Sequence, residues 1–179
     1  MNRTTIRAIL GTAFLFGILF TVWAVQARGD DVWTPLNFLL GTWSGQGTGK
    51  PGEAISGATT FSLDLNGKIL MRKNRAEYAA KPGEKAMVHE DLMIIYPQEA
   101  DPKFRAMYFD NEGHVIRYGI TVPAGKSSAV FETDAAEKGP RFRLVYELLP
   151  DGALSTEFLL APPGGDFKSY VKGVVRKSK

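Results

Sequence analysis

The sequence predicts an all-β protein: a single closed antiparallel up-and-down barrel of about ten strands, with a short helix at its N-terminal mouth. Turn signals such as Asn66-Gly67 and Asp151-Gly152 recur at short, even intervals, and the stretches between them have strand-like composition. A strand and its turn take roughly 14 residues, which leaves no room for crossover helices, so neighbouring strands pair antiparallel. Closing such a meander into a barrel removes its exposed edges.

The N-terminal segment has the order of a secretory signal peptide. Arg3 and Arg7 precede an uncharged, apolar stretch over residues 8–25, and Val25-Gln26-Ala27 supplies small residues at the spacing that a signal peptidase reads. We predict that residues 1–27 are cleaved after Ala27, leaving a barrel domain over 28–179. An uncleaved anchor is the alternative, because the stretch is at the lower limit for spanning a bilayer. Either way, the domain is predicted to be periplasmic or secreted.

A short helix is predicted directly before the first strand. Thr34 is suited to cap it, Pro35 fits the first helical position, and Gly41 ends it. The apolar residues that would plug one mouth of the barrel are Leu36, Phe38, Leu39 and Leu40.

Ten strands follow, and their side chains alternate between the two faces of the sheet. In the eighth strand, Leu144 and Tyr146 share one face, and Arg143 and Glu147 lie on the other. A barrel of ten strands is wider than its own side chains fill, so a cavity is expected. The predicted strands span approximately residues 42–49, 57–65, 68–78, 87–96, 103–110, 114–122, 127–133, 140–149, 153–161 and 167–176.

The opening strand carries the sequence Gly41-Thr42-Trp43-Ser44-Gly45-Gln46-Gly47-Thr48-Gly49, in which alternate glycines permit curvature and close approach. This element resembles the first strand of calycin barrels: lipocalins, fatty-acid-binding proteins and nitrobindin-like haem barrels. It is still more similar to exported bacterial families of unknown function built on that barrel, in which the Leu65-Asn66-Gly67-Lys68 hairpin also has a counterpart. The resemblance implies a calycin-like barrel over residues 35–177. The strand rhythm, the glycine-rich opening strand and the surplus of Tyr and Met favour a small, largely apolar molecule bound inside it.

Composition excludes several kinds of site. The chain has no cysteine and two histidines, so disulfides, thiolate sites and a multi-histidine metal centre are not expected. The haem-ligating histidine of nitrobindin-like proteins has no counterpart in residues 167–179, and we predict neither a cofactor nor a metal. Without residues 1–27 the chain has 22 − 2 = 20 basic and 19 acidic side chains, which argues against nucleic-acid binding. Membrane contact is expected only through an uncleaved N-terminal segment.

His89 and Asp91 are the first candidate site residues. On a strand they point to one side, with Glu90 on the other, so they could orient a ligand or act as a general base. The alternative is a surface hydrogen bond at a strand end.

A second candidate group surrounds the predicted hairpin at residues 110–114. Asp110 and His114 can face each other across the turn, next to Tyr108 and Tyr118, which would ring a barrel entrance. The alternative is that the pair only closes the hairpin.

Arginines form the third candidate group. Arg72 shares a strand face with Asn74, and Arg143 lies in the eighth strand. Fatty-acid-binding barrels hold a carboxylate with interior arginine and tyrosine, so the resemblance implies that Arg72 and Arg143 could do the same, together with Tyr108 and Tyr118. Alternation nevertheless places Arg143 opposite the apolar face, toward solvent.

The function predicted from these observations is binding of a small apolar or amphipathic molecule inside an exported barrel, without catalysis. Two alternatives stay open: a structural or interaction module with a filled barrel, and an enzyme that uses a His–Asp pair as general base in the barrel.

Overall fold

The computed structural model of the 179-residue chain describes residues 32–46, 54–80, 82–134 and 139–178. The predicted signal peptide, its cleavage site and the anchor alternative lie outside these residues, as do Gly47 and Gly49. In the part of the chain that the structure describes, no helix has the length and apolar character needed to cross a membrane.

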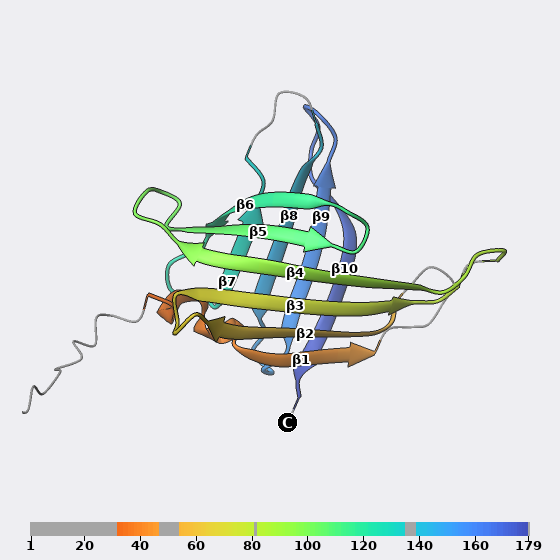
Figure 1. Ribbon diagram of the computed structural model, residues 1–179, viewed down its shortest axis with the longest axis horizontal. Coiled ribbons are helices and arrows are strands. Elements are labelled where there is room, and N and C mark those ends of the chain that lie inside the picture. Colours follow the sequence, from red (N-terminus) through yellow and green to blue (C-terminus); the bar gives the residue numbers. More distant parts are fainter. Residues whose placement is uncertain (1–31, 47–53, 81, 135–138, 179) are drawn as a thin grey trace, which may run out of the picture.

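Ten antiparallel strands form one closed barrel, in which each strand pairs with its neighbours in the chain and the first strand pairs with the last (Figure 1). This confirms the predicted fold class, and the strand bounds agree with the predicted spans to within three residues at each described end. The strands are β1 (Gly41–Gln46), β2 (Ala54–Asp64), β3 (Ile69–Tyr78), β4 (Met87–Pro97), β5 (Phe104–Asp110), β6 (Val115–Thr121), β7 (Ser128–Glu132), β8 (Arg141–Leu148), β9 (Leu154–Ala161) and β10 (Lys168–Lys177).

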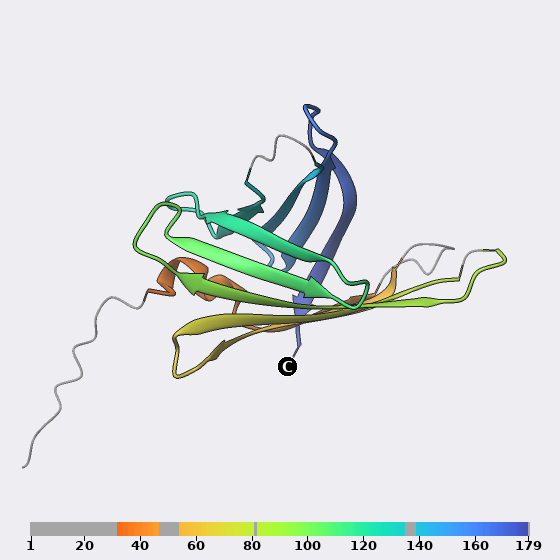
Figure 2. The ribbon, with the colours of Figure 1, turned by 45° about the horizontal axis from the view of Figure 1, so that its top comes forward.

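The barrel wall has two parts that run in different directions. In Figures 1 and 2, strands β2–β6 run across the view and β8–β10 run up it, so the two parts cross. The β2–β3 hairpin turns through Leu65, Asn66 and Gly67, all with positive φ, as the Asn-Gly pair predicts.

The helix before β1 is the 3₁₀-helix η1 (Thr34–Leu39), which closes one end of the barrel. The prediction that Thr34 caps this helix is wrong. Trp33 holds the cap position without a side-chain cap bond, because the first turn closes one residue earlier, through a hydrogen bond from the Leu36 amide to the Trp33 carbonyl (2.7 Å). Leu36 and Leu39 are fully buried, and the Trp43 indole donates to the Leu39 carbonyl at 2.7 Å. This hydrogen bond therefore links η1, at the closed end of the barrel, to β1.

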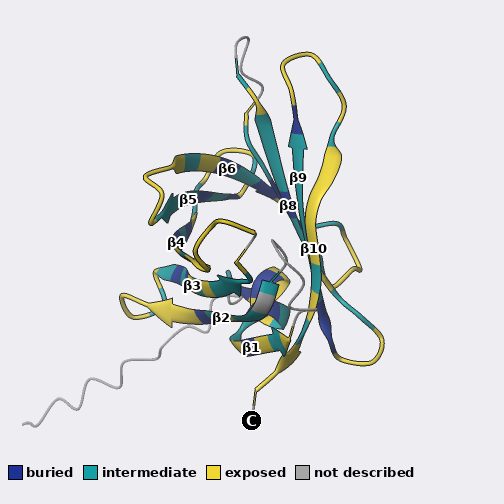
Figure 3. Cartoon of the chain, turned by 90° about the vertical axis from the view of Figure 1, so that its right-hand side faces the viewer, coloured by how far each residue is buried: buried dark blue, intermediate teal, exposed yellow. Residues whose placement is uncertain are grey.

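Burial changes along the barrel from this closed end to the other. Near η1 the inward side chains Phe61, Leu70 and Ile95 are fully buried. Toward the opposite end, Phe142 near the start of β8 and Phe158 in β9 are only half-buried. Much of β10 is exposed (Figure 3). One end is thus a packed core, whereas at the other the inward face meets solvent.

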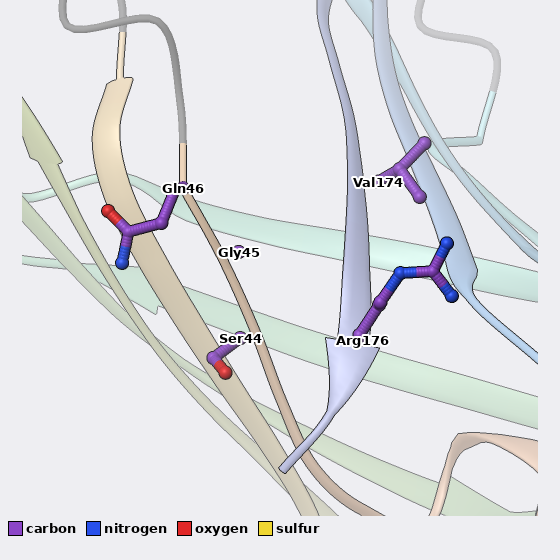
Figure 4. A pocket seen from close by; sticks show the side chains of 5 residues that line it. All are labelled: Ser44, Gly45, Gln46, Val174 and Arg176. Carbon is purple, nitrogen blue, oxygen red and sulfur yellow. The ribbon is translucent and has the colours of Figure 1, made fainter.

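The seam between β1 and β10 is short. Two residue pairs align there, Trp43 with Lys177 and Ser44 with Arg176, and beyond them the strands border a surface hollow of about 340 Å³ (Figure 4). A Cβ atom on Gly45 would lie 3.0 Å from the Val174 carbonyl oxygen, so this glycine permits the close approach that the opening motif predicted.

Candidate functional site

An ion pair lies inside the barrel between neighbouring strands. Arg72 in β3 and Asp91 in β4 both point inward, and an Arg72 Nη1 to Asp91 Oδ1 distance of 2.6 Å joins them. Their side chains are 9% and 3% exposed, so each charge depends on the other in a poorly solvated place. Burial lowers the pKa of Arg72, but the nearby Tyr146 and Asp91 raise it more, and the net shift is upward. Arg72 is therefore a permanent cation whose charge Asp91 balances.

Two further side chains complete the hydrogen bonds of this pair. Arg72 Nε donates to the Thr59 hydroxyl at 3.2 Å, and Asn74 Nδ2 donates to Asp91 Oδ2 at 2.8 Å. Asn74 and Asp91 are directly opposed in the β3–β4 register, which explains their contact. Both oxygens of the buried carboxylate are thus engaged.

The network continues from Asp91 to the rim through His89. The Nε2 atom of His89 lies 3.4 Å from Asp91 Oδ2 and 3.0 Å from the Tyr108 hydroxyl, and Nδ1 lies 2.9 Å from Glu112 Oε1. The hydrogen bond with Asp91 raises the pKa of His89 to about 9, against a smaller opposing effect of burial, and Glu112 adds to the rise. At neutral pH the ring is an imidazolium that donates from both nitrogens.

The β5–β6 hairpin supplies the outer part of the network. Tyr108 donates to Asp110 Oδ2 at 3.2 Å, and His114 Nδ1 lies 2.8 Å from the same oxygen. Burial raises the pKa of Asp110, but the backbone amide and side chain of His114 lower it more, so the net shift is downward. The His114 ring is 61% exposed and marks the rim. The predicted Asp110–His114 pair is present, and it closes the hairpin.

Aromatic rings surround the ion pair. Successive edge-to-face contacts join Tyr108, Tyr118, Phe131, Tyr146 and Phe61, with ring centroids 5.4 to 6.5 Å apart. Burial raises the pKa of Tyr108, Tyr118 and Tyr146, the last to about 12, so all three keep their protons at neutral pH. Tyr118 is buried below the rim, deeper than its predicted place at the entrance.

The hydroxyl of Tyr146 is buried and makes no hydrogen bond of normal geometry with a described residue, although the Arg72 side chain is close enough to act against the rise in its pKa. Its ring lies beneath the Arg72 guanidinium, with the Cζ atom of Arg72 at 5.9 Å from the ring centroid. Buried hydroxyls are nearly always hydrogen-bonded in proteins, so this one marks an incompletely satisfied point beside the ion pair.

An aromatic wall lies on the other side of the barrel entrance. We use this name for Phe142 in β8, Phe158 in β9 and Tyr170 in β10. Phe142 and Phe158 stack at 5.9 Å, and Tyr170 meets Phe158 edge-on at 6.2 Å. A surface hollow of about 460 Å³ borders this wall at Leu160 and Tyr170. The open end therefore has one polar side on β3–β6 and one aromatic side on β8–β10.

The structure brings together six of the seven predicted site residues. Arg72, His89, Asp91 and Tyr108 are linked through the network, His114 joins it through Asp110, and Tyr118 packs against Tyr108. Because His89 and Asp91 face inward, the surface-pair alternative does not hold for them.

Arg143 does not join this group. It lies on the outer face of β8, where it pairs with Glu132 at 2.6 Å and stacks over Phe167. Alternation explains this position, because its neighbours Phe142 and Leu144 point inward.

Sequence reasoning missed several members of the site. Thr59 and Tyr146 were expected to be ordinary strand residues, and Glu112 a turn residue. Alternation along β8 places Tyr146 inward, but nothing local indicates that its hydroxyl lies beside Arg72. Tyr170 sits at a register shift between β9 and β10, which strand alternation does not reveal.

No family model matches this chain, and a search of curated proteins found no match. The fold agrees with the calycin-like expectation at the level of architecture, as a closed ten-stranded antiparallel barrel. Among the described residues, no group of three or more His, Asp or Glu side chains is arranged to hold a metal ion.

Proposed function

We propose that this protein is an exported barrel that binds a small amphipathic molecule at its open end. The observation that carries the proposal is the contrast between the two ends of the barrel. Phe61, Leu70 and Ile95 are fully buried at the closed end, whereas inward apolar side chains at the other end remain partly exposed, with Val171 at 40%. Partly exposed apolar side chains beside a few convergent polar groups are typical of small-molecule sites.

The two sides of the open end suit an amphipathic ligand. The aromatic wall offers ring faces to an apolar body, and the polar side offers Asn74, His89 and Tyr108 to a head group. The buried Tyr146 hydroxyl below them makes no hydrogen bond of normal geometry with a described residue, and this supports a role in recognition, because an incompletely bonded group costs free energy in a purely structural core.

The test is uptake of a neutral hydrophobic dye such as Nile red, followed by its fluorescence. Val171→Asp places a carboxylate on the inward face of β10, opposite Phe158, and should weaken dye binding at least about tenfold. Val174→Asp is the matched control: this valine lies on the outward face of the same strand, is 51% exposed, and should leave binding unchanged. The absence of dye uptake, or equal effects of the two substitutions, would count against the proposal.

A general-base enzyme receives weaker support. His89 and Asp91 both face inward, 3.4 Å apart, as this alternative requires. However, a pKa of about 9 keeps His89 protonated at neutral pH, and both ring nitrogens already have partners. A protonated imidazole serves as a hydrogen-bond donor or general acid rather than a base.

A further inference from the structure

The charges of the polar side determine which head group the barrel would accept. Interior arginine was expected to hold a carboxylate, but Arg72 is already paired with Asp91 at 2.6 Å and bonded to Thr59. A second carboxylate would have to displace a buried partner that also accepts a hydrogen bond from Asn74. Displacing it would leave the buried Asp91 with only His89, 3.4 Å away, to balance its charge, which is costly.

Carboxylates outnumber cations in this network. Asp91, Asp110 and Glu112 face two cations, Arg72 and His89, when His89 is counted as protonated. Asp91 and Asp110 are buried and balance Arg72 and a protonated His89, and Glu112 at the rim adds a formal charge of −1; a neutral His89 would leave −2. Glu112 and His114 are both exposed, at 46% and 61%, and His114 lies 2.8 Å from Asp110, so water screens the charges at the rim.

The aromatic wall lies on the opposite side of the entrance, where Phe142, Phe158 and Tyr170 would contact the apolar chain and not the head group. The head group therefore meets the charges of the polar side.

We infer that the binding site proposed above selects amphiphiles with a cationic, ammonium-type head group over those with a carboxylate. The inference rests on the proposed function, since it specifies the ligand of that same site. The head group would lie near Glu112 and Tyr108 at the rim, with the apolar chain along the aromatic wall.

The experiment compares three ligands with the same alkyl chain: dodecylamine, dodecanol and dodecanoate, each below its micelle concentration, as competitors of the bound neutral dye. The amine should bind at least about tenfold more tightly than the carboxylate, with the alcohol between them. Equal binding of all three, or tightest binding of dodecanoate, would overturn the inference and leave the proposed function standing. Failure of the dye itself to bind would instead overturn the proposed function.

Two substitutions connect the preference to the network. Asp91→Asn leaves Arg72 without its balancing charge and should shift the amine-to-carboxylate ratio at least about tenfold toward dodecanoate. Glu112→Gln removes a rim carboxylate without stranding a buried charge, and should lower amine affinity severalfold even if the first variant folds poorly. Glu90→Gln, on the outward face of the same strand as Asp91, is the control and should change nothing. Unchanged ratios in Glu112→Gln would contradict the assignment of charge selection to this network.

Discussion

The buried pair of Arg72 and Asp91 permits a direct measurement of how far the polar network contributes to stability. Arg72→Met keeps a side chain of similar length but removes the cation. The Asp91 side chain, 3% exposed, would then keep only His89, 3.4 Å away, as a cationic partner, and the hydrogen bond to Thr59 would be lost. Breaking a buried pair in this way costs about 3–5 kcal/mol of unfolding free energy. Urea unfolding can follow it through Trp33 and Trp43, which are both buried.

The outer surface offers a matched control. Arg143 and Glu132 also form an arginine–carboxylate pair between adjacent strands, but their side chains are 34% and 35% exposed. Arg143→Met should therefore cost no more than about 1 kcal/mol. The double variant Arg72→Met/Asp91→Leu should recover most of the stability lost in the single variant, because it leaves no unpaired charge. A loss below about 1 kcal/mol for Arg72→Met would refute the assignment of a tightly coupled interior pair.

Three further predictions test other parts of the barrel. Folding raises the pKa of His89 from 6.5 to about 9, so the protonated ring stabilises the fold fully below pH 6.5, and this contribution is lost between pH 6.5 and 9. After screening by solvent, the free energy of unfolding should fall by about 1–2 kcal/mol over this range. His89→Gln should flatten this part of the curve of stability against pH. Tyr146→Phe should leave the free energy of unfolding unchanged or raise it by up to about 1 kcal/mol, because its hydroxyl makes no hydrogen bond of normal geometry with a described residue. Tyr108→Phe loses two hydrogen bonds and should lower it by about 1–2 kcal/mol, and a larger loss for Tyr146→Phe would contradict the contacts described. Gly45→Val should cost about 1–3 kcal/mol in urea unfolding, because a Cβ atom there lies 3.0 Å from the Val174 carbonyl oxygen, and an unaffected variant would show that the seam is looser.

The barrel could be predicted from the sequence because its determinants are local. Turn residues such as Asn66-Gly67 mark the strand ends, and alternation in β8 assigns Leu144 and Tyr146 to the interior and Arg143 to the outside, as the structure shows. Both signals act over a few residues and need no knowledge of distant partners.

The site depends on register, which local signals do not fix. Alternation indicates that Arg72 and Asn74 share a face, and likewise His89 and Asp91, but the alignment of β3 with β4 decides whether the two groups meet. The eight residues between Tyr78 and Met87 allow several alignments, and a shift of one residue would turn Asp91 away from Arg72. In the structure Asn74 stands opposite Asp91, and the ion pair follows from that register.

A barrel interior filled with apolar side chains would be at least as stable as one that contains this network, because buried ion pairs seldom exceed the stability of well-packed hydrophobic substitutes. Here the polar groups run without interruption from Arg72 through Asp91 and His89 to Glu112 at the rim. One buried hydroxyl beside them, that of Tyr146, makes no hydrogen bond of normal geometry with a described residue. Proteins depart from the most stable choice chiefly at functional sites. A continuous polar path from the middle of the barrel to its open end, facing partly exposed aromatic rings, is such a departure, and it is the reason we propose recognition of a ligand there.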